Sequence, residues 1–523
     1  MSISHDADLT LPSLVAALPT GNRELQLVLT IVFHPDTSRI GEQAVLPDLA
    51  AMPSWILGRR SPTFSRDGAQ AATPLGGRHI SRQAISLGSS GDGLSVRRLS
   101  DSSRCRVDGI ELRESLELSQ QQLQRGVRVL LGHSVVLLLR LAPEISTVPA
   151  NPALQELHGG SAYMAGLRKQ VVRLADSGLD VLIRGETGTG KELVAAAVHR
   201  ASCRGDRAMV SINMAAIPPG LAAATLFGST RGAFTGATRA SEGFFAQAQG
   251  STLFLDEIGE TPDEVQPQLL RALQQREIQA VGGNIQKVDV RIISATDSAL
   301  DSESCDFRAT LRHRLGAGEI HLLPLREHPE DIGELLLHFL TSQAKQLGCA
   351  DLLPGEDSAE GKIAAWAALF HSFLGYSWPG NIRELANFAG QVLVASEEGL
   401  TLPDTVNLAF MQGDTGSPAV SKAAACPPRR SIREFDEQEF DSALQESDYE
   451  VANVARKLGV SRQAVYRRMG ESPHHRLAGQ VSEPELERVL TLRAGDARAA
   501  AMDLKVSVSG LRSRLRDSSL FWF

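Results

Sequence analysis

Two short groups of residues near the middle of the chain have the types and spacing needed to bind and split a nucleoside triphosphate. The first is the glycine-rich run 185–191, which follows the apolar residues 181–183 and precedes a helix-forming segment. A strand, a glycine loop and a helix in this order surround phosphate oxygens with backbone N–H groups and a helix N-terminus. Lys191 is expected to reach the β- and γ-phosphates. The residues expected to hold the nucleotide here are Gly185, Glu186, Thr187, Gly188, Thr189, Gly190, Lys191 and Glu192.

The second group is the carboxylate pair Asp256-Glu257, which closes the apolar run 251–256. Asp256 is expected to hold Mg²⁺, directly or through water, and Glu257 to polarise the attacking water. An apolar run ending in two carboxylates is common at helix starts, but at this distance after a phosphate loop it indicates a catalytic site. Glu192 stands where many such loops place a Mg²⁺-binding Ser or Thr.

The elements that must position these residues alternate between strand and helix from residue 162 to about residue 322. Apolar, β-branched runs predict strands at 181–183, 209–214, 251–256, 288–295 and 319–323, with helical segments between them such as 265–276. This alternation predicts an α/β nucleotide-binding sheet. Residues 323–402 are rich in helix formers and are expected to form a helical lid.

Composition sets the limits for the rest of the chain. A length of 523 residues suits three or four domains, and a net charge of −8 means that any basic surface must be local. The five cysteines are scattered and odd in number, which favours a reducing compartment over a disulfide framework. The N-terminus lacks the pattern of a signal peptide, and the apolar run 135–139 is far too short to span a membrane. We therefore expect a soluble, cytoplasmic protein with no membrane partner.

Residues 1–149 read mainly as β structure. Strands are predicted at 25–33, 55–59, 79–82, 94–99 and 135–139, separated by Gly, Ser and Pro turns. Many short strands with turns predict a β-sandwich, and the lack of a nucleophile or metal cluster favours a binding module. Residues 150–160 are expected to form a short polar linker.

The N-terminal pattern resembles a forkhead-associated domain, a sandwich that captures phosphothreonine peptides. The resemblance rests on Gly58-Arg59, Ser81-Arg82, Val107-Asp108-Gly109 and Leu131-Gly132. It implies that Arg59, Ser81 and Arg82 hold the phosphate through charge-assisted hydrogen bonds. The chain departs from the family at Ala84, at Ser103-Arg104-Cys105 and at Asp108, so the peptide-binding Asn is missing. The alternative is a degenerate sandwich that packs on its neighbour.

A closer resemblance runs from about residue 157 to residue 402. The segments GETGTGKE, GAFTGA, TLFLDEIGE, VDVRIISAT and WPGNIREL, in this order, resemble the AAA+ ATPase domain of sigma-54-dependent transcriptional activators. In that family the GAFTGA loop contacts the sigma factor, mainly through its Phe and Thr. The matching residues here are Gly232, Ala233, Phe234, Thr235, Gly236 and Ala237.

The same resemblance assigns further residues around the nucleotide. Asn213 matches the residue that couples the catalytic Glu to the loop, and Arg383 matches the nucleotide sensor of the lid. Arg308 and Arg314 match the arginines that each subunit offers to its neighbour's ATP, which implies a ring, by resemblance a hexamer, with a dimer as the inactive form. Asp297 stands where the first sensor is usually Asn. Ionised Asp only accepts hydrogen bonds and would repel the γ-phosphate, so hydrolysis or its sensing could be altered.

The C-terminal residues from Ser431 onward predict a small helical bundle, after a Gly-, Ser-, Pro- and Ala-rich linker at 411–430. A tight turn at 458–461 precedes a helix over 462–469, so the pattern is a helix-turn-helix whose second helix can enter the major groove. It resembles the Fis-type DNA-binding domain. The residues on the accessible face, expected to contact DNA, are Arg462, Gln463, Tyr466 and Arg467. Residues 497–515 align with 451–469 at a shift of 46, which predicts a second, diverged helix-turn-helix for DNA binding or for dimer packing.

The sequence thus predicts a multidomain chain: a β-sandwich (1–149), an α/β AAA+ core (150–322), its helical lid (323–405), a linker (406–430), an all-α helix-turn-helix (431–471) and its diverged repeat (472–523). The expected function is an ATP-dependent transcription activator that binds DNA and remodels sigma-54 RNA polymerase, with ATP and Mg²⁺ as cofactors. Two alternatives stay open. One is a DNA-binding repressor in which nucleotide is only an allosteric ligand, and the other is a signalling scaffold that uses the sandwich.

Overall fold

The computed structural model describes residues 25–46, 54–66, 72–77, 79–91, 93–99, 104–143, 151–233, 239–297, 307–396, 399–413 and 437–447, and parts of 449–511, the longest being 451–458, 483–493 and 497–504. The chain divides into two compact units. The first contains an N-terminal β domain, the nucleotide-binding core and the lid, and the second contains the C-terminal helices. Within the described residues, none of the helices combines the length and the apolar character needed to cross a membrane.

The N-terminal β domain, Leu25–Pro143, consists of two antiparallel sheets that share one apolar core. The strand order is β2-β1-β12-β11-β8-β9 in the larger sheet and β10-β7-β6-β3 in the smaller sheet. The β-rich character predicted from the sequence is confirmed, and the sandwich and forkhead-associated identities stay predictions. The bounds are β1 Leu25–Phe33, β2 Gln43–Val45, β3 Trp55–Leu57, β4 Thr63–Phe64, β5 Thr73–Pro74, β6 Ile85–Ser90, β7 Gly93–Arg98, β8 Cys105–Val107, β9 Ile110–Glu111, β10 Ser115–Leu118, α1 Gln120–Arg125, β11 Val127–Leu131 and β12 Val135–Pro143.

One strand prediction in this domain is wrong. Residues 79–84 form a turn, and the strand begins at Ile85. The turn places the Ser81 carbonyl where it accepts the backbone N–H of Arg59 at 2.9 Å. It also packs the Arg82 carbonyl against Gly58, where a Cβ would collide with it. The Ser81 carbonyl therefore bonds a neighbouring loop, and the sheet pairing starts only at Ala84, whose N–H donates to the Leu57 carbonyl of β3 at 2.9 Å.

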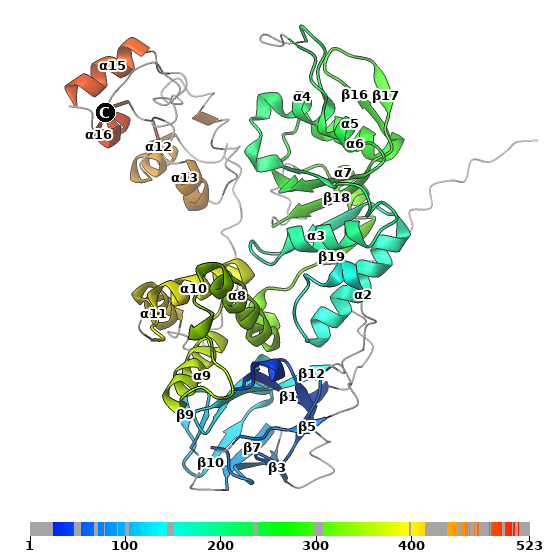
Figure 1. Cartoon of the computed structure of the whole chain (residues 1–523). Helices are drawn as coiled ribbons and strands as arrows, with labels where there is room; N and C mark the ends of the chain where they lie inside the picture. The colour runs from blue at the N-terminus through cyan, green and yellow to red at the C-terminus, as the bar shows by residue number, and fades with distance from the viewer. Residues whose placement is uncertain are drawn as a thin grey trace, which may run out of the picture. The chain divides into compact units, whose positions relative to one another are not determined.

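The strands β1, β11 and β12 are buried on both faces. Leu29 and Ile31 of β1 point into the core shared by the two sheets, whereas Val32 and Phe33 join a second core with lid residues. Phe33 stacks on Phe370 with ring centroids 4.9 Å apart. Figure 1 shows the lid helices α8 (Ile332–Leu347) and α9 (Glu360–Leu374) beside this sheet. The mostly apolar composition of β1, with Gln26 and Thr30 as its polar residues, fits this double burial.

The nucleotide-binding core is a five-stranded parallel sheet in the order β14-β15-β18-β13-β19. Because carboxyl ends of parallel strands meet at one edge, the residues that follow β13, β15 and β18 are brought together there. The bounds are α2 Ala162–Ser177, β13 Val181–Arg184, α3 Lys191–Arg200, β14 Val210–Asn213, α4 Ala222–Phe227, α5 Phe244–Gln247, β15 Thr252–Asp256, α6 Gln266–Gln275, β16 Glu277–Gln279, β17 Ile285–Lys287, β18 Arg291–Thr296, α7 Ala309–Leu315 and β19 Gly318–His321.

Residues 151–160 are not the polar linker that the sequence predicted. Leu154 and Leu157 are buried in the core beneath the sheet, and residues Pro152–Leu154 form a 3-10 helix capped by Asn151. The sequence signal for this burial was the pair Leu154 and Leu157, spaced three residues apart within an otherwise polar segment. This stretch therefore belongs to the nucleotide-binding core.

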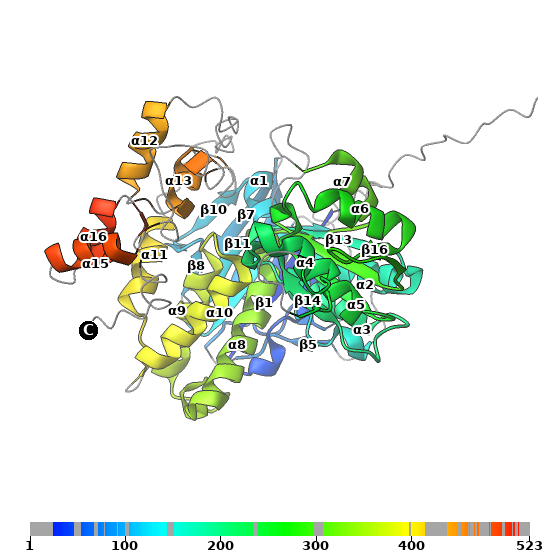
Figure 2. The same ribbon diagram turned by 90° about the horizontal axis from the view of Figure 1, so that it is seen from above.

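The lid consists of α8 and α9 with α10 (Asn381–Ala395) and α11 (Asp404–Gly413), and Figure 2 shows α8, α9 and α10 grouped together. An aromatic cluster fixes the start of α10. The fully buried Trp378 contacts Phe373, Tyr376 and Phe388 at centroid distances of 5.4, 5.0 and 5.7 Å, and its indole N–H donates to the Phe373 carbonyl. This packing holds the residues directly before α10 in place.

Among its described residues, the second unit contains two helix pairs. The first pair is α12 (Glu437–Glu446) and α13 (Val451–Leu458), and the second is α15 (Glu483–Leu492) and α16 (Ala497–Leu504). The bounds of the second pair lie 46 residues after those of the first pair. Each pair has its own apolar core, and the buried residues correspond at the same offset: Phe440 and Leu486, Ala443 and Val489, Val454 and Ala500, Ala455 and Ala501, Leu458 and Leu504, and Val465 and Leu511.

Candidate active site

The glycine loop joins β13 to α3, and two of its glycines have backbone angles that favour glycine. Gly188 has φ 83° and Gly190 has φ 93°. A Cβ at Gly188 would also collide with the carbonyl of Gly380 in the lid. Lys191 is the buried first residue of α3, and its Nζ donates to the Gly185 carbonyl at 3.0 Å. The ammonium group thus lies across the loop.

The carboxylate pair stands at the carboxyl end of β15, beside the loop. Glu257 has φ 51° and ψ 49°, an uncommon backbone for a residue with a side chain. Asn213 donates from Nδ2 to Asp256 Oδ2 at 3.1 Å. The residue predicted to couple Glu257 to the GAFTGA loop therefore bonds to the carboxylate next to it.

Glu257 has an electrostatic environment suited to proton transfer. Burial raises the pKa of Glu257 to about 7, with further raising contributions from Asp297 and Asp256 and a lowering contribution from Lys191. A carboxyl group with a pKa near the working pH can both accept a proton and release it, which is what a general base requires.

Asp297 follows the end of β18 and reaches the glycine loop. Its Oδ2 accepts a hydrogen bond of 2.8 Å from Thr187 Oγ1. The side chain is exposed. Asp297, which departs from the family, therefore bonds the phosphate loop and also raises the pKa of Glu257.

Asn381, which the sequence analysis did not assign, links the lid to the glycine loop. It is fully buried and has φ 53°. Its Oδ1 accepts from the Leu325 N–H at 2.9 Å, and its Nδ2 donates to Glu186 Oε2 and to the Thr187 carbonyl, both at 3.1 Å. The signal was present, because Asn381 lies within the segment WPGNIREL, but the sequence does not say which residues it bonds.

Arg326 is a second unassigned residue at the loop. Its guanidinium forms a bidentate pair with Glu186, with distances of 2.9 and 2.6 Å. Hydrogen bonds from Arg326 hold the pKa of the Glu186 carboxyl below its usual value. Arg383 also meets the loop, where its backbone N–H donates to the Gly188 carbonyl at 3.3 Å, while its side chain is exposed.

The two arginines predicted to serve a neighbouring subunit lie at the start of α7 and in its last turn. Arg308 is the exposed N-terminal cap residue of α7, and its backbone N–H donates to Gln266 Oε1 at 2.9 Å. Arg314 donates from Nη2 to the Leu273 carbonyl at 3.2 Å, within its own chain. Their role toward a second subunit stays a prediction.

These residues fit a magnesium nucleotide. The loop offers backbone N–H groups, a helix N-terminus and the Lys191 ammonium to phosphate oxygens. Hard oxygen ligands are what Mg²⁺ prefers, and Asp256 supplies one at the strand end. Thr189 Oγ1 donates its proton to the Glu186 carbonyl at 2.7 Å, which leaves the lone pairs of the hydroxyl oxygen as acceptors.

Several predicted contact residues lie outside the described residues. Gly232 is exposed and Ala233 is half-buried. The rest of the GAFTGA loop and the predicted DNA contacts are outside the description: Phe234, Thr235, Gly236, Ala237, Arg462, Gln463, Tyr466 and Arg467. The two inward residues predicted for the second helix of the helix-turn-helix, Val465 and Met469, are buried.

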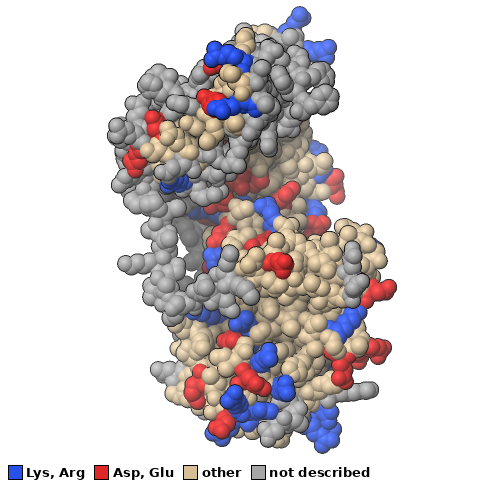
Figure 3. All heavy atoms as spheres, turned by 90° about the vertical axis from the view of Figure 1, so that its left-hand side faces the viewer, with Lys and Arg blue, Asp and Glu red and all other residues tan. Residues whose placement is uncertain are grey.

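The residues predicted to hold a phosphopeptide lie near one another in the N-terminal β domain. The Arg59 N–H donates to the Ser81 carbonyl at 2.9 Å, which joins the two loops, and Arg82 is exposed. Figure 3 shows Lys and Arg side chains alternating with Asp and Glu side chains over this domain, so the coloured residues form no single continuous basic patch on that face.

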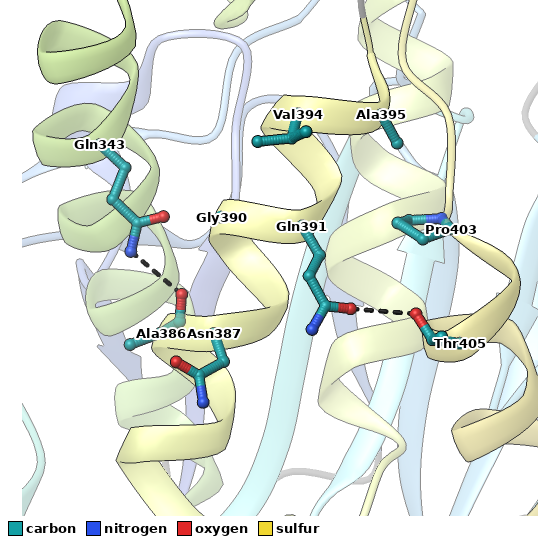
Figure 4. Close-up of a pocket in the computed structure, with 9 residues that line it drawn as sticks. All are labelled: Gln343, Ala386, Asn387, Gly390, Gln391, Val394, Ala395, Pro403 and Thr405. Carbon is teal, nitrogen blue, oxygen red and sulfur yellow. Dashed lines mark hydrogen bonds between the residues drawn. The ribbon is translucent and has the colours of Figure 1, made fainter. Parts of the chain in front are cut away.

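An open groove of about 620 Å³ lies in the lid, between α8, α10 and the start of α11 (Figure 4). Three of its polar side chains have partners within the lid: Gln343 donates to the Ala386 carbonyl and Thr405 to Gln391, both at 3.0 Å. Gly390 on its wall is nine residues along α10 from Asn381, roughly 13 Å at the helical rise. The groove is therefore separate from the nucleotide site.

The glycine loop, the paired carboxylates and a helical lid around one parallel sheet define an AAA+ ATPase domain. Family models agree: residues 157–321 match the sigma-54 interaction domain, residues 326–422 match the AAA+ ATPase lid domain, and residues 431–471 match the Fis family of bacterial regulatory proteins.

The chain belongs to the family of sigma-54-dependent transcriptional regulators. It is 34% identical to the regulator SfnR of Pseudomonas fluorescens over 62% of this chain and 92% of SfnR, and 38% identical to NtrC of Escherichia coli over 62% of this chain and 71% of NtrC. It is also 44% identical to the formate hydrogenlyase activator FhlA of Escherichia coli over 48% of this chain, but spans only 36% of FhlA. Among solved structures, NtrX of Brucella abortus in complex with ATP matches at 29% identity over 60% of this chain and 69% of that chain, with a TM-score of 0.42.

Proposed function

We propose that this protein is an ATP-dependent transcription activator that binds DNA and remodels sigma-54 RNA polymerase to open promoters. The observation that carries the proposal is the meeting of the glycine loop, the carboxylate pair and lid residue Asn381 at one site. The GAFTGA sequence extends from the same ATPase core and is followed by a Fis-type domain.

In the proposed reaction Lys191 binds the β- and γ-phosphates and Glu257 takes a proton from the attacking water. The pKa of about 7 lets Glu257 accept this proton at neutral pH. Mg²⁺ held by Asp256 would neutralise negative charge on the phosphates when bound. Asn213 keeps the Asp256 carboxylate oriented through its 3.1 Å hydrogen bond.

Hydrolysis is proposed to require a ring of subunits. Arg308 is exposed at the start of α7 and is free of any assigned role in its own nucleotide site, which suits a group offered to a neighbour. A trans arginine stabilises charge on the γ-phosphate, an effect on the order of 10³–10⁵ in rate. By family resemblance the ring is a hexamer formed from inactive dimers.

The GAFTGA loop is proposed to deliver the work of hydrolysis to sigma-54. Its base is anchored, since the Thr230 N–H donates to the Val281 carbonyl at 3.0 Å, beside the β16–β17 hairpin. Phe234 and Thr235 are then the residues that contact the sigma factor. DNA binding is assigned to 431–471, with Arg462, Gln463, Tyr466 and Arg467 at the groove.

The N-terminal β domain is proposed to be a forkhead-associated sandwich that binds a phosphothreonine protein and regulates the ATPase in the cytoplasm. Its support is the joining of the Arg59 and Ser81 loops. Charge-assisted hydrogen bonds from Arg59, Ser81 and Arg82 would hold the phosphate.

A second candidate function is a DNA-binding repressor in which nucleotide is an allosteric ligand. One observation favours it: Asp297 adds a carboxylate at Thr187, next to where phosphates bind, and this disfavours a γ-phosphate there.

Steady-state ATP hydrolysis by the full chain separates these functions. We expect turnover by the wild type, loss of turnover in Glu257→Ala, and normal turnover in Glu264→Ala, which removes an exposed carboxylate from the same region. A wild type that binds ATP without turnover would reject the activator and favour the repressor.

A further inference from the structure

Arg140 of the N-terminal β domain reaches out of its own domain into the lid. It lies on β12, with its side chain about one-fifth exposed, and all three guanidinium nitrogens have acceptors. Nε donates to the Gln124 carbonyl at 3.0 Å, Nη1 to Glu330 Oε2 at 2.5 Å and Nη2 to the Glu327 carbonyl at 2.8 Å. The guanidinium is therefore fixed in one geometry, with two of its three bonds crossing to the lid.

The two acceptors in the lid belong to one short segment, residues 325–331, which we call the connecting turn. It consists of two 3-10 helices, Leu325–Glu327 and Pro329–Asp331. Glu327 directly follows Arg326, the residue that forms the bidentate pair with Glu186 of the glycine loop. Arg140 thus donates to the carbonyl of Glu327, the residue directly after Arg326, and Arg326 forms the ion pair with the phosphate loop.

Both ends of the connecting turn are fixed as well. At its start the Leu325 N–H donates to Asn381 Oδ1 at 2.9 Å. At its end the fully buried Asp331 accepts from the Ser161 N–H at 2.9 Å and from Ser161 Oγ at 2.6 Å. Between these ends Arg140 holds the Glu327 carbonyl, directly after Arg326, and the Glu330 carboxylate. A rigid turn with one arginine facing the loop is what positioning requires, since small displacements at such a site change ligand binding strongly.

From these contacts we infer that Arg140 is a positioning residue for ATP binding and hydrolysis, acting through the connecting turn and Arg326 on Glu186. The inference rests on the ATPase activity proposed above. It makes the N-terminal β domain a structural part of the nucleotide site, beyond any peptide that the domain binds.

The electrostatics of Glu186 give the direction of the effect. Glu186 is the second residue of the glycine loop, so its carboxylate would repel the phosphates unless a cation offsets it. Arg326 supplies that cation. Exposed ion pairs contribute little in general, but the bidentate geometry and the added bond from Asn381 make this pair an exception. Freeing the turn lets Arg326 leave Glu186, and the KM for ATP then rises while kcat changes little.

A purely structural role for Arg140 has a different signature. Arg140→Met alone leaves Glu330 as a buried carboxylate without its cation, which is destabilising by itself. The double variant Arg140→Met/Glu330→Met removes the pair and keeps apolar packing. If Arg140 only stabilises the fold, the double variant restores normal ATPase kinetics. If Arg140 positions the turn, the double variant keeps the raised KM, because the Glu327 carbonyl still lacks its donor.

The experiment is a double-mutant cycle on the KM of ATP in the full-length chain. We expect about a fivefold rise in KM for Arg140→Met, about a tenfold rise for Arg326→Met and no further rise when the two are combined, with kcat within about twofold throughout. The matched control is Arg66→Met. Arg66 pairs with Glu334 of α8 at 2.7 Å across the same domain boundary, outside the connecting turn, so the KM of this variant should equal that of the wild type.

Three results would overturn the inference: multiplicative effects in the cycle, a KM rise in Arg66→Met equal to that in Arg140→Met, or normal KM in Arg140→Met/Glu330→Met. A wild type without ATP turnover would instead reject the proposed function itself. In that case direct titration with ATP replaces KM, and the same cycle on the dissociation constant decides whether Arg140 positions the loop.

Discussion

Replacing Asp297 by Asn tests whether this unusual carboxylate sets the protonation of the catalytic base. Asp297 raises the pKa of Glu257, which burial and its neighbours bring to about 7. Removing one neighbouring negative charge lowers a carboxyl pKa by about one unit or more. We therefore expect the pKa of Glu257 to fall to about 6 in Asp297→Asn.

The size of the effect depends on pH, because only ionised Glu257 acts as a base. With a pKa of about 7, roughly 10% of Glu257 is ionised at pH 6, and with a pKa of about 6, roughly half is ionised. Asp297→Asn should then hydrolyse ATP about fivefold faster than the wild type at pH 6, about twofold faster at pH 7 and at the same rate at pH 8.

The assay is kcat for ATP between pH 5.5 and 8.5 at saturating Mg²⁺. The control is Asp176→Asn, which removes an exposed carboxylate from α2 and should leave the profile unchanged. If the half-maximal pH of Asp297→Asn equals that of the wild type, Asp297 does not govern the protonation of Glu257, and the electrostatic account of the site is wrong.

Three further predictions concern stability. Burial, aided by Arg128, lowers the pKa of His371 from 6.5 to about 4. The unfolded chain therefore binds more protons than the folded chain between these pH values, and the folded state loses at most about 3 kcal/mol of stability as pH falls through this window. In urea denaturation, His371→Leu should lose less stability than the wild type between pH 7 and pH 4.5, and an equal loss would contradict this. A Cβ at Gly333 of α8 would stand 2.5 Å from the Val32 carbonyl, so Gly333→Ala should lower the stability of the protein by about 1–3 kcal/mol in thermal unfolding. Gly166→Ala is the control, because Gly166 has open space around it and the change should cost no stability. Equal melting temperatures for the two variants would reject the close packing of the lid on β1. Asp331→Ala removes the acceptor of Ser161 and His328, and a loss in urea unfolding much below about 3 kcal/mol would show that this buried cluster contributes little.

The local part of the nucleotide site could be predicted from the sequence. A glycine loop after an apolar strand, and Asp256-Glu257 at the end of another, are patterns whose geometry follows from neighbouring residues in the chain. The parallel sheet then brings their carboxyl ends together without further information.

The contacts from the lid could not be predicted in the same way. Glu186 and Arg326 are 140 residues apart, and Asn381 bonds the glycine loop from 195 residues away. A lone arginine or asparagine carries no signal of its partner, because pairing depends on how helices pack. Asn381 also has a left-handed backbone, which its residue type tolerates but does not require.

In the N-terminal β domain, the composition of β1 was a partial signal of its packing against the lid. β1 has two polar residues among nine, Gln26 and Thr30, fewer than a strand with one solvated face usually carries, and in the structure its outer face is covered by the lid. Such a composition is compatible with a strand that is buried on both faces. It did not indicate that the second face packs on α8 and α9, since no local pattern links those segments.

In vitro transcription from a sigma-54 promoter tests the central claim most directly. Full-length wild type and Thr235→Ala are compared for open-complex formation and for ATP hydrolysis in the same reaction. We predict that the wild type opens the promoter only with hydrolysable ATP, and that Thr235→Ala hydrolyses ATP at a similar rate yet forms no open complexes. Promoter opening by Thr235→Ala, or failure of the wild type to open the promoter while it hydrolyses ATP, would contradict the account.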